Sequence, residues 1–244
     1  MAHLYRVSDN APLVAGSTVT LEGDEARHAS SVARLTPGEN VALTDGRGLM
    51  AQSVVQESSA QRVTLVVASV EDVAPLTPEV WLVQALAKGD RDERAVEACT
   101  ELGVDRIIPW QAARSVARWS GAKIEKSVAR WQRIAGEASK QSLRAWVPGV
   151  ENMVELQQLV DMASSTRMVL LEPMASLALH QAIPAGDQPV VLVVGPEGGI
   201  SPQEREALEN AGATSASLGP LVMRTSTAGV AALSVLNHTL GRFE

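Results

Sequence analysis

The stretch PVVLVVGPEGGISPQERE, residues 189–206, leads from a run of apolar, β-prone residues into a glycine-rich turn and then a helix start. A second stretch of the same kind, SASLGPLVMRTSTAGVAAL, follows at residues 215–233. Both predict strand, tight loop and helix, with Gly195-Pro196 and Gly219-Pro220 at the carboxyl ends of the strands. Ligands bind at that edge of open α/β sheets. The pair therefore predicts an α/β fold with a ligand site beside both loops.

The residues of the first loop narrow the class of ligand. Gly195, Gly198 and Gly199 permit positive φ and close approach to the backbone. Their spacing is not the dinucleotide-binding G-x-G-x-x-G, and no lysine stands where a P-loop needs one. Glu197 would repel phosphates, so a ligand that is neutral or positive at its reactive end fits better. The alternative is a pair of tight turns with caps, with Ser201 as an N-cap before a proline.

The motif GPEGG-I-S-P-x-E, followed by LGP-x-x-x-RT-x-TA, closely resembles the RsmE family of 16S ribosomal RNA methyltransferases. The resemblance implies a SPOUT fold, a mainly parallel α/β sheet whose C-terminal segment forms a trefoil knot. It also implies an enzyme that uses S-adenosylmethionine to methylate N3 of a uridine in 16S rRNA of the small ribosomal subunit.

By the same resemblance, three loops hold the cofactor, and MVLLEP at residues 168–173 resembles the third of them. The cofactor-binding residues predicted in this way are Leu171, Glu172, Pro173, Gly195, Pro196, Glu197, Gly198, Leu218, Gly219, Leu221, Met223, Thr225 and Ala228. No metal is expected.

Two residues are predicted to act in catalysis. Arg224, at a loop–helix junction, is placed to stabilise a developing uridine oxyanion, with a structural salt bridge as the alternative. Glu197, together with Glu172, offers negative charge to a positive sulfonium. Relatives tend to have glutamate where this chain has Ser226, so no general base is predicted.

Length and composition set the broad class. The 244 residues are 45% hydrophobic and 20% charged, as in a soluble globular protein of one large or two small domains. The single cysteine, Cys99, excludes an internal disulfide framework and is expected to pack in a helix. No signal peptide and no apolar run of about 20 residues is visible, so a cytoplasmic protein without a membrane partner is expected.

Residues 1–73 predict a small β-barrel domain, and residues 74–79, which include two prolines, predict a linker. Strands are expected at residues 17–21, 40–44, 49–55 and 62–70. A helix is expected at 24–35, with His28, Val32 and Leu35 on one face and His28 packed rather than catalytic. The row EARHASSVARLTPGENVALTDGRG resembles the PUA-like domain of the RsmE family, which implies RNA binding.

Residues 80–244 predict the catalytic domain, in which strands and helices alternate as in a parallel sheet. Strands are expected at 80–86, 106–110, 168–172, 190–194 and 215–218. The first helix is predicted to open with Asp90 and Glu93 in a capping box and to end at Gly103.

A basic helix is the clearest sign of nucleic acid. The net charge is −7, but residues 88–149 carry +4. In the helix expected at 123–144, apolar residues gather around Trp131 on one face, and the opposite face is basic with few carboxylates. A solvated outer face is the alternative. The predicted RNA-binding residues are Arg27, Arg34, Lys88, Arg114, Lys126, Arg130, Arg133, Lys140, Gln141 and Arg144.

The end of this helix departs from the family. Relatives tend to read Glu-Gln-Ser-Gly-Arg where this chain reads Lys140-Gln141-Ser142-Leu143-Arg144. The leucine puts in doubt the close backbone approach that a glycine would allow.

The last helix, 225–240, is rich in small residues, with Val230, Leu233, Leu236 and Leu240 spaced for burial. By the resemblance it belongs to the knotted domain through which the family forms homodimers. Two other functions stay open: a related SPOUT methyltransferase acting on tRNA or a ribose 2′-hydroxyl, and a non-catalytic RNA-binding ribosome-assembly factor.

Overall fold

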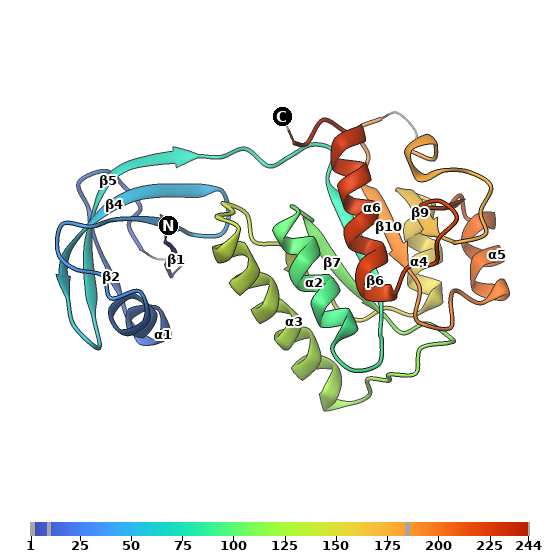
Figure 1. Cartoon of the computed structure of the whole chain (residues 1–244), viewed down its shortest axis with the longest axis horizontal. Helices are drawn as coiled ribbons and strands as arrows, with labels where there is room; N and C mark the ends of the chain where they lie inside the picture. Colours follow the sequence, from blue (N-terminus) through green and yellow to red (C-terminus); the bar gives the residue numbers. More distant parts are fainter. Residues whose placement is uncertain (1–2, 9–10, 184–185, 244) are drawn as a thin grey trace. The chain divides into compact units, whose positions relative to one another are not determined.

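The computed structural model describes residues 3–8, 11–183 and 186–243, which form two compact units (Figure 1). The first comprises Met1–Pro75 with Ser139–Val147, and the second Leu76–Ala138 with Pro148–Glu244. The elements of the first unit are β1 Leu4–Arg6, β2 Thr18–Leu21, α1 Gly23–Arg27, the π-helix η1 His28–Val32, β3 Asn40–Thr44, β4 Leu49–Ser58 and β5 Val63–Asp72. Those that follow are β6 Val80–Ala85, α2 Arg91–Glu101, β7 Arg106–Trp110, α3 Ala122–Gln141, β8 Gly149–Val150, α4 Leu156–Ala163, β9 Arg167–Leu171, the 3₁₀-helix η2 Leu179–Gln181, β10 Val190–Val194, α5 Pro202–Asn210, β11 Thr214–Ala216 and α6 Thr225–Thr239.

The first unit is a curled, barrel-like sheet in the order β1-β3-β4-β5-β2, antiparallel except for the parallel pair β1 and β3. Register shifts interrupt the pairing of the long strands β4 and β5, and such bulges bend a strand and increase its twist. Tyr5, Leu43 and Leu65 are fully buried in its core. The four strands predicted in this region are confirmed. The three-residue β1 was missed because it is too short to show alternation.

The helix expected at 24–35 is wrong in its second half. After α1 the chain forms the π-helix η1, in which the amide of Ala33 donates to the carbonyl of His28. A π-turn carries an extra residue, so the helical spacing of the apolar face is lost. Leu35 is buried, but Val32 is 67% exposed, and His28 is exposed with its ring 5.6 Å from that of Tyr5.

The first unit also includes a segment from the middle of the chain, Ser139–Val147, although the sequence predicts residues 80–244 to form one catalytic domain. Trp146 forms an isolated β-bridge with Arg47, and its indole N–H donates to the carbonyl of Val73 at 2.7 Å. The amides of Gly48 and Val147 also donate to the carbonyls of Ala145 and Gly46. Separate contacts of this kind leave no periodic pattern in the sequence. Residues 73–79 contain no helix or strand.

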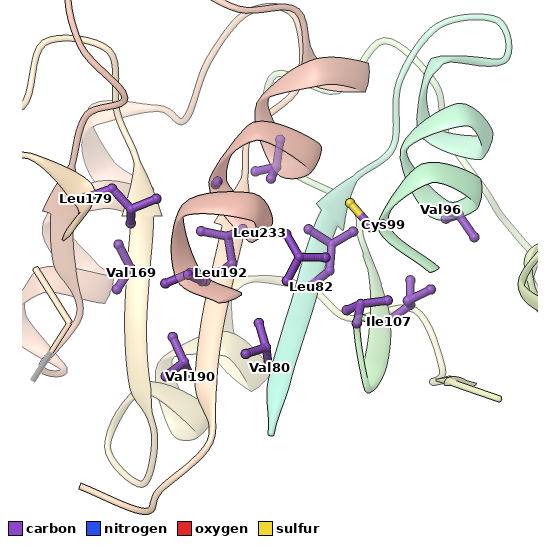
Figure 2. Packing of buried hydrophobic residues seen from close by; sticks show 14 of the residues in the cluster. Val80, Leu82, Val96, Cys99, Ile107, Val169, Leu179, Val190, Leu192 and Leu233 are labelled. Atoms are coloured by element: carbon purple, nitrogen blue, oxygen red, sulfur yellow. The ribbon is translucent and has the colours of Figure 1, made fainter. Parts of the chain in front are cut away.

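The second unit is a parallel six-stranded sheet in the order β11-β9-β10-β6-β7-β8. Successive residues of a buried strand pack on opposite faces, as in β10, where Val190, Leu192 and Val194 join one core and Val191 and Val193 the other. Figure 2 shows the first core, in which strand residues meet α6 and α2. The five strands predicted here are confirmed, and the two-residue β8 was missed.

The core confirms the expected packing of Cys99. Its thiol is fully buried, and burial raises its pKa to about 12. Beside it, a Cβ on Gly229 would lie 3.5 Å from the Cys99 sulfur and 3.3 Å from Leu82, so α6 approaches the sheet closely. In α6, Leu233 and Leu236 are buried as predicted.

The start of α2 differs from the predicted capping box. Asp90 makes no capping hydrogen bond and pairs instead with Arg94 at 2.8 Å. The carboxylate of Asp92 accepts from the backbone amides of Ala87 and Glu93. Burial raises the pKa of Asp92, although these hydrogen bonds oppose the rise. The predicted helix end is confirmed, because Gly103 follows the last turn with φ +89°.

The helix α3 ends in a Schellman motif, in which the amide of Arg144 donates to the carbonyl of Ser139 and that of Leu143 to Lys140. Leu143 therefore adopts φ +56°, a conformation that glycine adopts with less strain. The backbone keeps the shape that a glycine would favour although the side chain differs. The predicted trefoil knot stays a prediction. No helix in the described ranges has the length and apolar content needed to cross a bilayer.

Candidate functional site

A cavity of about 400 Å³ opens beside the carboxyl ends of β9, β10 and β11 in the second unit. Three loops that follow these strands form its walls, and the start of α6 and Arg91 of α2 complete them. The lining residues are Arg91, Leu171, Glu172, Pro173, Val194, Gly195, Pro196, Glu197, Gly199, Ile200, Ala216, Ser217, Leu218, Leu221, Val222, Met223, Arg224, Thr225 and Ala228.

Most predicted cofactor residues line this one cavity. The exceptions are Gly198 and Gly219, which lie in the loops but not in its wall. Arg91 was missed because it comes from a helix about 100 residues earlier in the chain, and its sequence context is that of an ordinary exposed helix start. The other missed residues, such as Ile200 and Val222, are close in sequence to predicted ones. They would have been predicted if more residues of each loop had been included.

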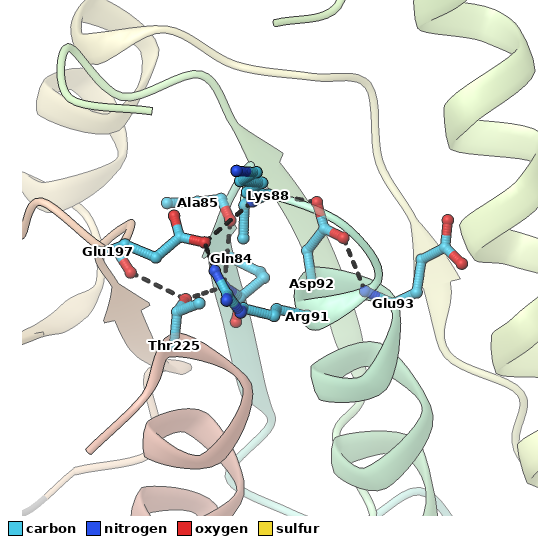
Figure 3. Close-up of polar contacts among 10 residues, drawn as sticks. Gln84, Ala85, Lys88, Arg91, Asp92, Glu93, Glu197 and Thr225 are labelled. Carbon is cyan, nitrogen blue, oxygen red and sulfur yellow. Dashed lines mark hydrogen bonds and ion pairs between the residues drawn. The ribbon is translucent and has the colours of Figure 1, made fainter. Parts of the chain in front are cut away.

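The first loop, residues 195–201, is tied to the β6–α2 connection through Glu197. One carboxylate oxygen of Glu197 accepts from the guanidinium of Arg91 at 2.6 Å and from the backbone amide of Lys88 at 3.0 Å (Figure 3). Burial alone would raise the pKa of Glu197. The hydrogen bonds from its own amide, Arg91 and Lys88, with the charge of Arg91, outweigh burial and hold the pKa below its ordinary value.

Two further contacts fix the first loop. Arg114 donates to the carbonyl of Gly198 at 3.0 Å, and its Cβ would lie 3.2 Å from a Cβ on that glycine. At Gly195 a Cβ would lie 2.9 Å from the Ile200 side chain, closer than real contacts allow. The helix α5 then starts with the predicted N-cap, since Ser201 and Glu204 form a capping box.

A buried hydroxyl joins the first loop to α6. Thr225, the first residue of α6, donates to the carbonyl of Gly195 at 2.9 Å and accepts from the amide of Gln84 at 2.8 Å (Figure 3). Gln84 is fully buried at the carboxyl end of β6. One side chain thus joins the ends of β6 and β10 to the start of α6.

The second loop, residues 217–224, contrasts with the first. Within the described residues, positions 218–223 make no hydrogen bond. Leu221 and Val222 are 75% and 79% exposed although both also line the cavity. Only the loop's ends are held, by the pairing of Ser217 with residues 177–179 and by the Thr225 hydroxyl.

Arg224 stands where this second loop meets α6, as its N-cap residue, with the carbonyl accepting from the amides of Thr227 and Ala228. Its side chain is exposed at the cavity wall and has no hydrogen bond or ion pair within the described ranges. The alternative of a structural salt bridge therefore finds no partner there. Its guanidinium is available to a ligand.

Glu172 follows β9 and lines the same cavity. Its closest cation is Arg205, at 3.9 Å, and the amide of Met174 lies 3.5 Å from its other oxygen. Both distances are at the limit for such contacts. The cavity wall thus carries one tightly paired carboxylate, Glu197, and one loosely held carboxylate, Glu172.

Some of the basic residues predicted to bind RNA form ion pairs within the protein. In α3, Arg130 pairs with Glu93 of α2 at 2.7 Å, and Lys140 pairs with Glu25 of α1 at 2.8 Å. The stripe carries few carboxylates of its own, as predicted, but these two cations find their partners on other elements. The apolar face is confirmed, since Trp131 and Ala135 are buried.

The remaining basic residues divide by unit. Lys126 and Arg133 are exposed on α3 and have no partner in the described part of the second unit, where Lys88 is also exposed. Arg27 and Arg34 are exposed in the first unit, to which Gln141 and Arg144 also belong. Arg34 has φ +55° where the chain leaves η1.

The cavity suits a cofactor that carries both apolar surface and charge. Leucine, valine, methionine and proline side chains supply the apolar wall, and Glu172 and Arg224 supply one loosely held charge of each sign. No group of three or more His, Cys, Asp or Glu side chains able to hold a metal occurs among the residues described.

Comparisons with known proteins agree with this geometry. Residues 74–237 match the family described as "RNA methyltransferase domain", and residues 21–68 match "RNA methyltransferase PUA domain". The ribosomal RNA small subunit methyltransferase E of Mycobacterium bovis is 38% identical over 234 residues, covering 94% of this chain and 89% of its own. The Bacillus subtilis protein of the same name is 33% identical, covering 91% and 90%.

Solved structures show the same fold. That of a ribosomal RNA small subunit methyltransferase E from Neisseria gonorrhoeae, bound to S-adenosylmethionine, has a TM-score of 0.87 at 28% identity and covers 98% of both chains. A Legionella pneumophila methyltransferase with bound S-adenosylmethionine also has a TM-score of 0.87, at 29% identity over 98% of both chains.

Proposed function

The chain belongs to the RNA methyltransferase family whose relatives are named ribosomal RNA small subunit methyltransferase E, and we propose that it methylates N3 of a uridine in 16S rRNA with S-adenosylmethionine as donor. The observation that carries the proposal is the cavity beside β9, β10 and β11, where three loops from separate parts of the sequence meet. The relatives' names and the cofactor-bound structures support the substrate and the donor.

Catalysis in this cavity is mainly positioning. The cofactor, when bound, supplies an electrophilic methyl group on a positive sulfonium. The Thr225 hydroxyl, with its hydrogen bonds to Gly195 and Gln84, is called the Thr225 joint below. This joint and the first loop hold the cavity in shape, so that two reactants meet at attack distance. Arg224 stabilises the negative charge that develops on the uridine oxygen when the N3 proton leaves. Ser226 is a poor base, so proton removal is not assigned to this position.

RNA binding is proposed for both units. In the second unit Lys88, Lys126 and Arg133 are exposed cations that can contact phosphates. Arg114 and Arg130 also face solvent, although each has a partner within the protein. In the first unit Arg27 and Arg34 are exposed, and the match to an RNA methyltransferase PUA domain supports a role in holding RNA.

Two further expectations are carried as part of the proposal. The chain acts as a homodimer through the second unit, supported by the apolar side chains of Leu221 and Val222 on the exposed second loop. It acts in the cytoplasm, where ribosomal subunits form.

The proposal is tested by mapping methylated nucleotides in 16S rRNA from a strain lacking this gene, with the gene restored as a control. We expect a single 3-methyluridine to disappear and to return on complementation. If no 3-methyluridine is lost, the substrate is wrong. Calorimetry on the purified chain tests the cofactor separately, since a non-catalytic assembly factor would not bind S-adenosylmethionine.

A further inference from the structure

We propose that Glu172 is the residue by which the cavity distinguishes the charged methyl donor from its uncharged product. The inference rests on the proposed function and deepens it. It assigns the electrostatic role to Glu172 alone, whereas the sequence suggested both Glu172 and Glu197.

The negative charge of Glu197 is compensated by a cation within the protein. Arg91 lies 2.6 Å from its carboxylate, and the Lys88 amide donates to the same oxygen. A paired glutamate and arginine present almost no net charge to a third group. Glu197 therefore shapes the first loop and contributes little field to the cavity.

The charge of Glu172 is less compensated. Its closest cation, Arg205, is at 3.9 Å and lies half-exposed on α5, where solvent weakens the pair. The Glu172 side chain is only 17% exposed, so its own field is less screened on the cavity side. Of the two carboxylates in the wall, it is the one free to act on a bound cation.

Methyl transfer changes the charge of the ligand in the cavity that Glu172 lines. Sulfur keeps the electron pair of the broken sulfur–methyl bond, so the positive sulfonium becomes a neutral thioether. A nearby carboxylate stabilises the first species and has no charge to attract in the second. Glu172 therefore favours binding of the donor over the product, S-adenosylhomocysteine, and so favours product release.

The test compares the affinities of both ligands by calorimetry. We expect Glu172→Gln to weaken binding of S-adenosylmethionine about five- to tenfold and binding of S-adenosylhomocysteine less than about twofold. The double variant Arg91→Met with Glu197→Gln is the matched control, because it removes a nearly neutral pair from the cavity wall and should weaken both ligands alike. Glu206→Gln removes an exposed charge of α5 that does not line the cavity and should change neither.

The outcomes separate this inference from the proposed function. If the wild-type chain binds neither ligand, the proposed function fails. If the wild type binds both and Glu172→Gln weakens them equally, or weakens neither, only the role of Glu172 is overturned. Arg205→Gln provides a second measurement, should Glu172→Gln fold poorly: it removes the cation that lies 3.9 Å from Glu172, so the preference for the donor should rise, and an unchanged ratio would contradict the proposal.

Discussion

The two loops that flank the cavity share a Gly-Pro turn at the end of a strand, yet they differ in how many hydrogen bonds hold them to the rest of the protein. The first, residues 195–201, is held by Arg91, Lys88, Arg114 and the Thr225 hydroxyl. The second, residues 217–224, has no hydrogen bond over positions 218–223 within the described residues. Its apolar side chains stand in solvent.

This difference indicates that the two loops have different roles. The fixed loop gives the cavity its shape, and the loosely held loop leads to Arg224, whose unpaired guanidinium lies at the cavity wall and which we propose acts on the uridine. Loops that close on substrates are commonly drawn from the least stabilised parts of a fold. The partners that fix the first loop come from other parts of the chain, so similar turn sequences do not reveal which loop is rigid.

The largest expected effect is on Arg224. Arg224→Ala should lower the turnover number by about 10² to 10³-fold, the usual cost of losing one donor to a developing oxyanion. Its affinity for S-adenosylmethionine should change little, because the first loop is intact. Single-turnover methylation of rRNA and calorimetry measure the two quantities. A variant that still turns over at the wild-type rate would remove Arg224 from the mechanism and end the proposed division between the loops.

The next effect is on the Thr225 joint. Thr225→Val leaves the buried amide of Gln84 and the carbonyl of Gly195 without their partner, which should cost about 1–3 kcal/mol of unfolding free energy. Cofactor affinity should fall about tenfold because both loops meet at this joint. Urea denaturation and calorimetry test this, with Thr225→Ser, which keeps the hydroxyl, as control. If Thr225→Val changed neither the unfolding free energy nor the cofactor affinity, the Thr225 hydroxyl would not couple the first loop to the start of α6.

A smaller effect is expected from the first loop's ion pair, and it depends on pH. The pKa of Glu197 in the folded protein lies below its ordinary value of 4.5. Its contribution to stability is therefore complete above that value and is lost as the pH falls through the folded-state pKa. Glu197→Gln should lower stability at pH 7, and the difference from wild type should shrink in acid. Thermal unfolding from pH 7 to pH 3 measures it, and a difference that grew in acid would contradict the pairing.

The smallest effect is expected in the second loop. At protein concentrations low enough for the chain to be monomeric, Leu221→Ser and Val222→Ser should change the unfolding free energy by no more than about 0.5 kcal/mol, because neither side chain is packed in the single chain. Ile200→Ser, at a buried position of the first loop, is the contrasting control and should cost several times more. Thermal unfolding at two protein concentrations checks both. A large, concentration-dependent loss at Leu221 would show that a second copy covers this loop.

Much of the second unit could be predicted from sequence because its strands are continuous apolar runs ended by glycine and proline. β10 and β7 have the predicted bounds, and most residues that the family resemblance predicts to bind the cofactor line one cavity. The contribution of Arg91 could not be predicted, since an arginine at a helix start usually faces solvent. Only the three-dimensional pairing with Glu197 brings it to the wall.

In the basic helix α3, the sequence predicted the buried face but not the ion pairs of the exposed face. Its periodicity correctly predicted which face is buried, because that depends on spacing alone. Periodicity carries no information about carboxylates on other elements, so the pairs Arg130–Glu93 and Lys140–Glu25 were not foreseen. The π-turn at η1 was missed for a related reason, since one inserted residue shifts every later position on the helix.

The buried state of Cys99 has a practical consequence for measuring the second loop. With its pKa raised to about 12 and no exposed surface, its thiol should not react with maleimides at neutral pH. A cysteine introduced at Val222, which is 79% exposed, would then take a fluorescent label alone, with no need to remove the native thiol. Emission from that probe could report directly on whether the loop closes when donor or RNA is added.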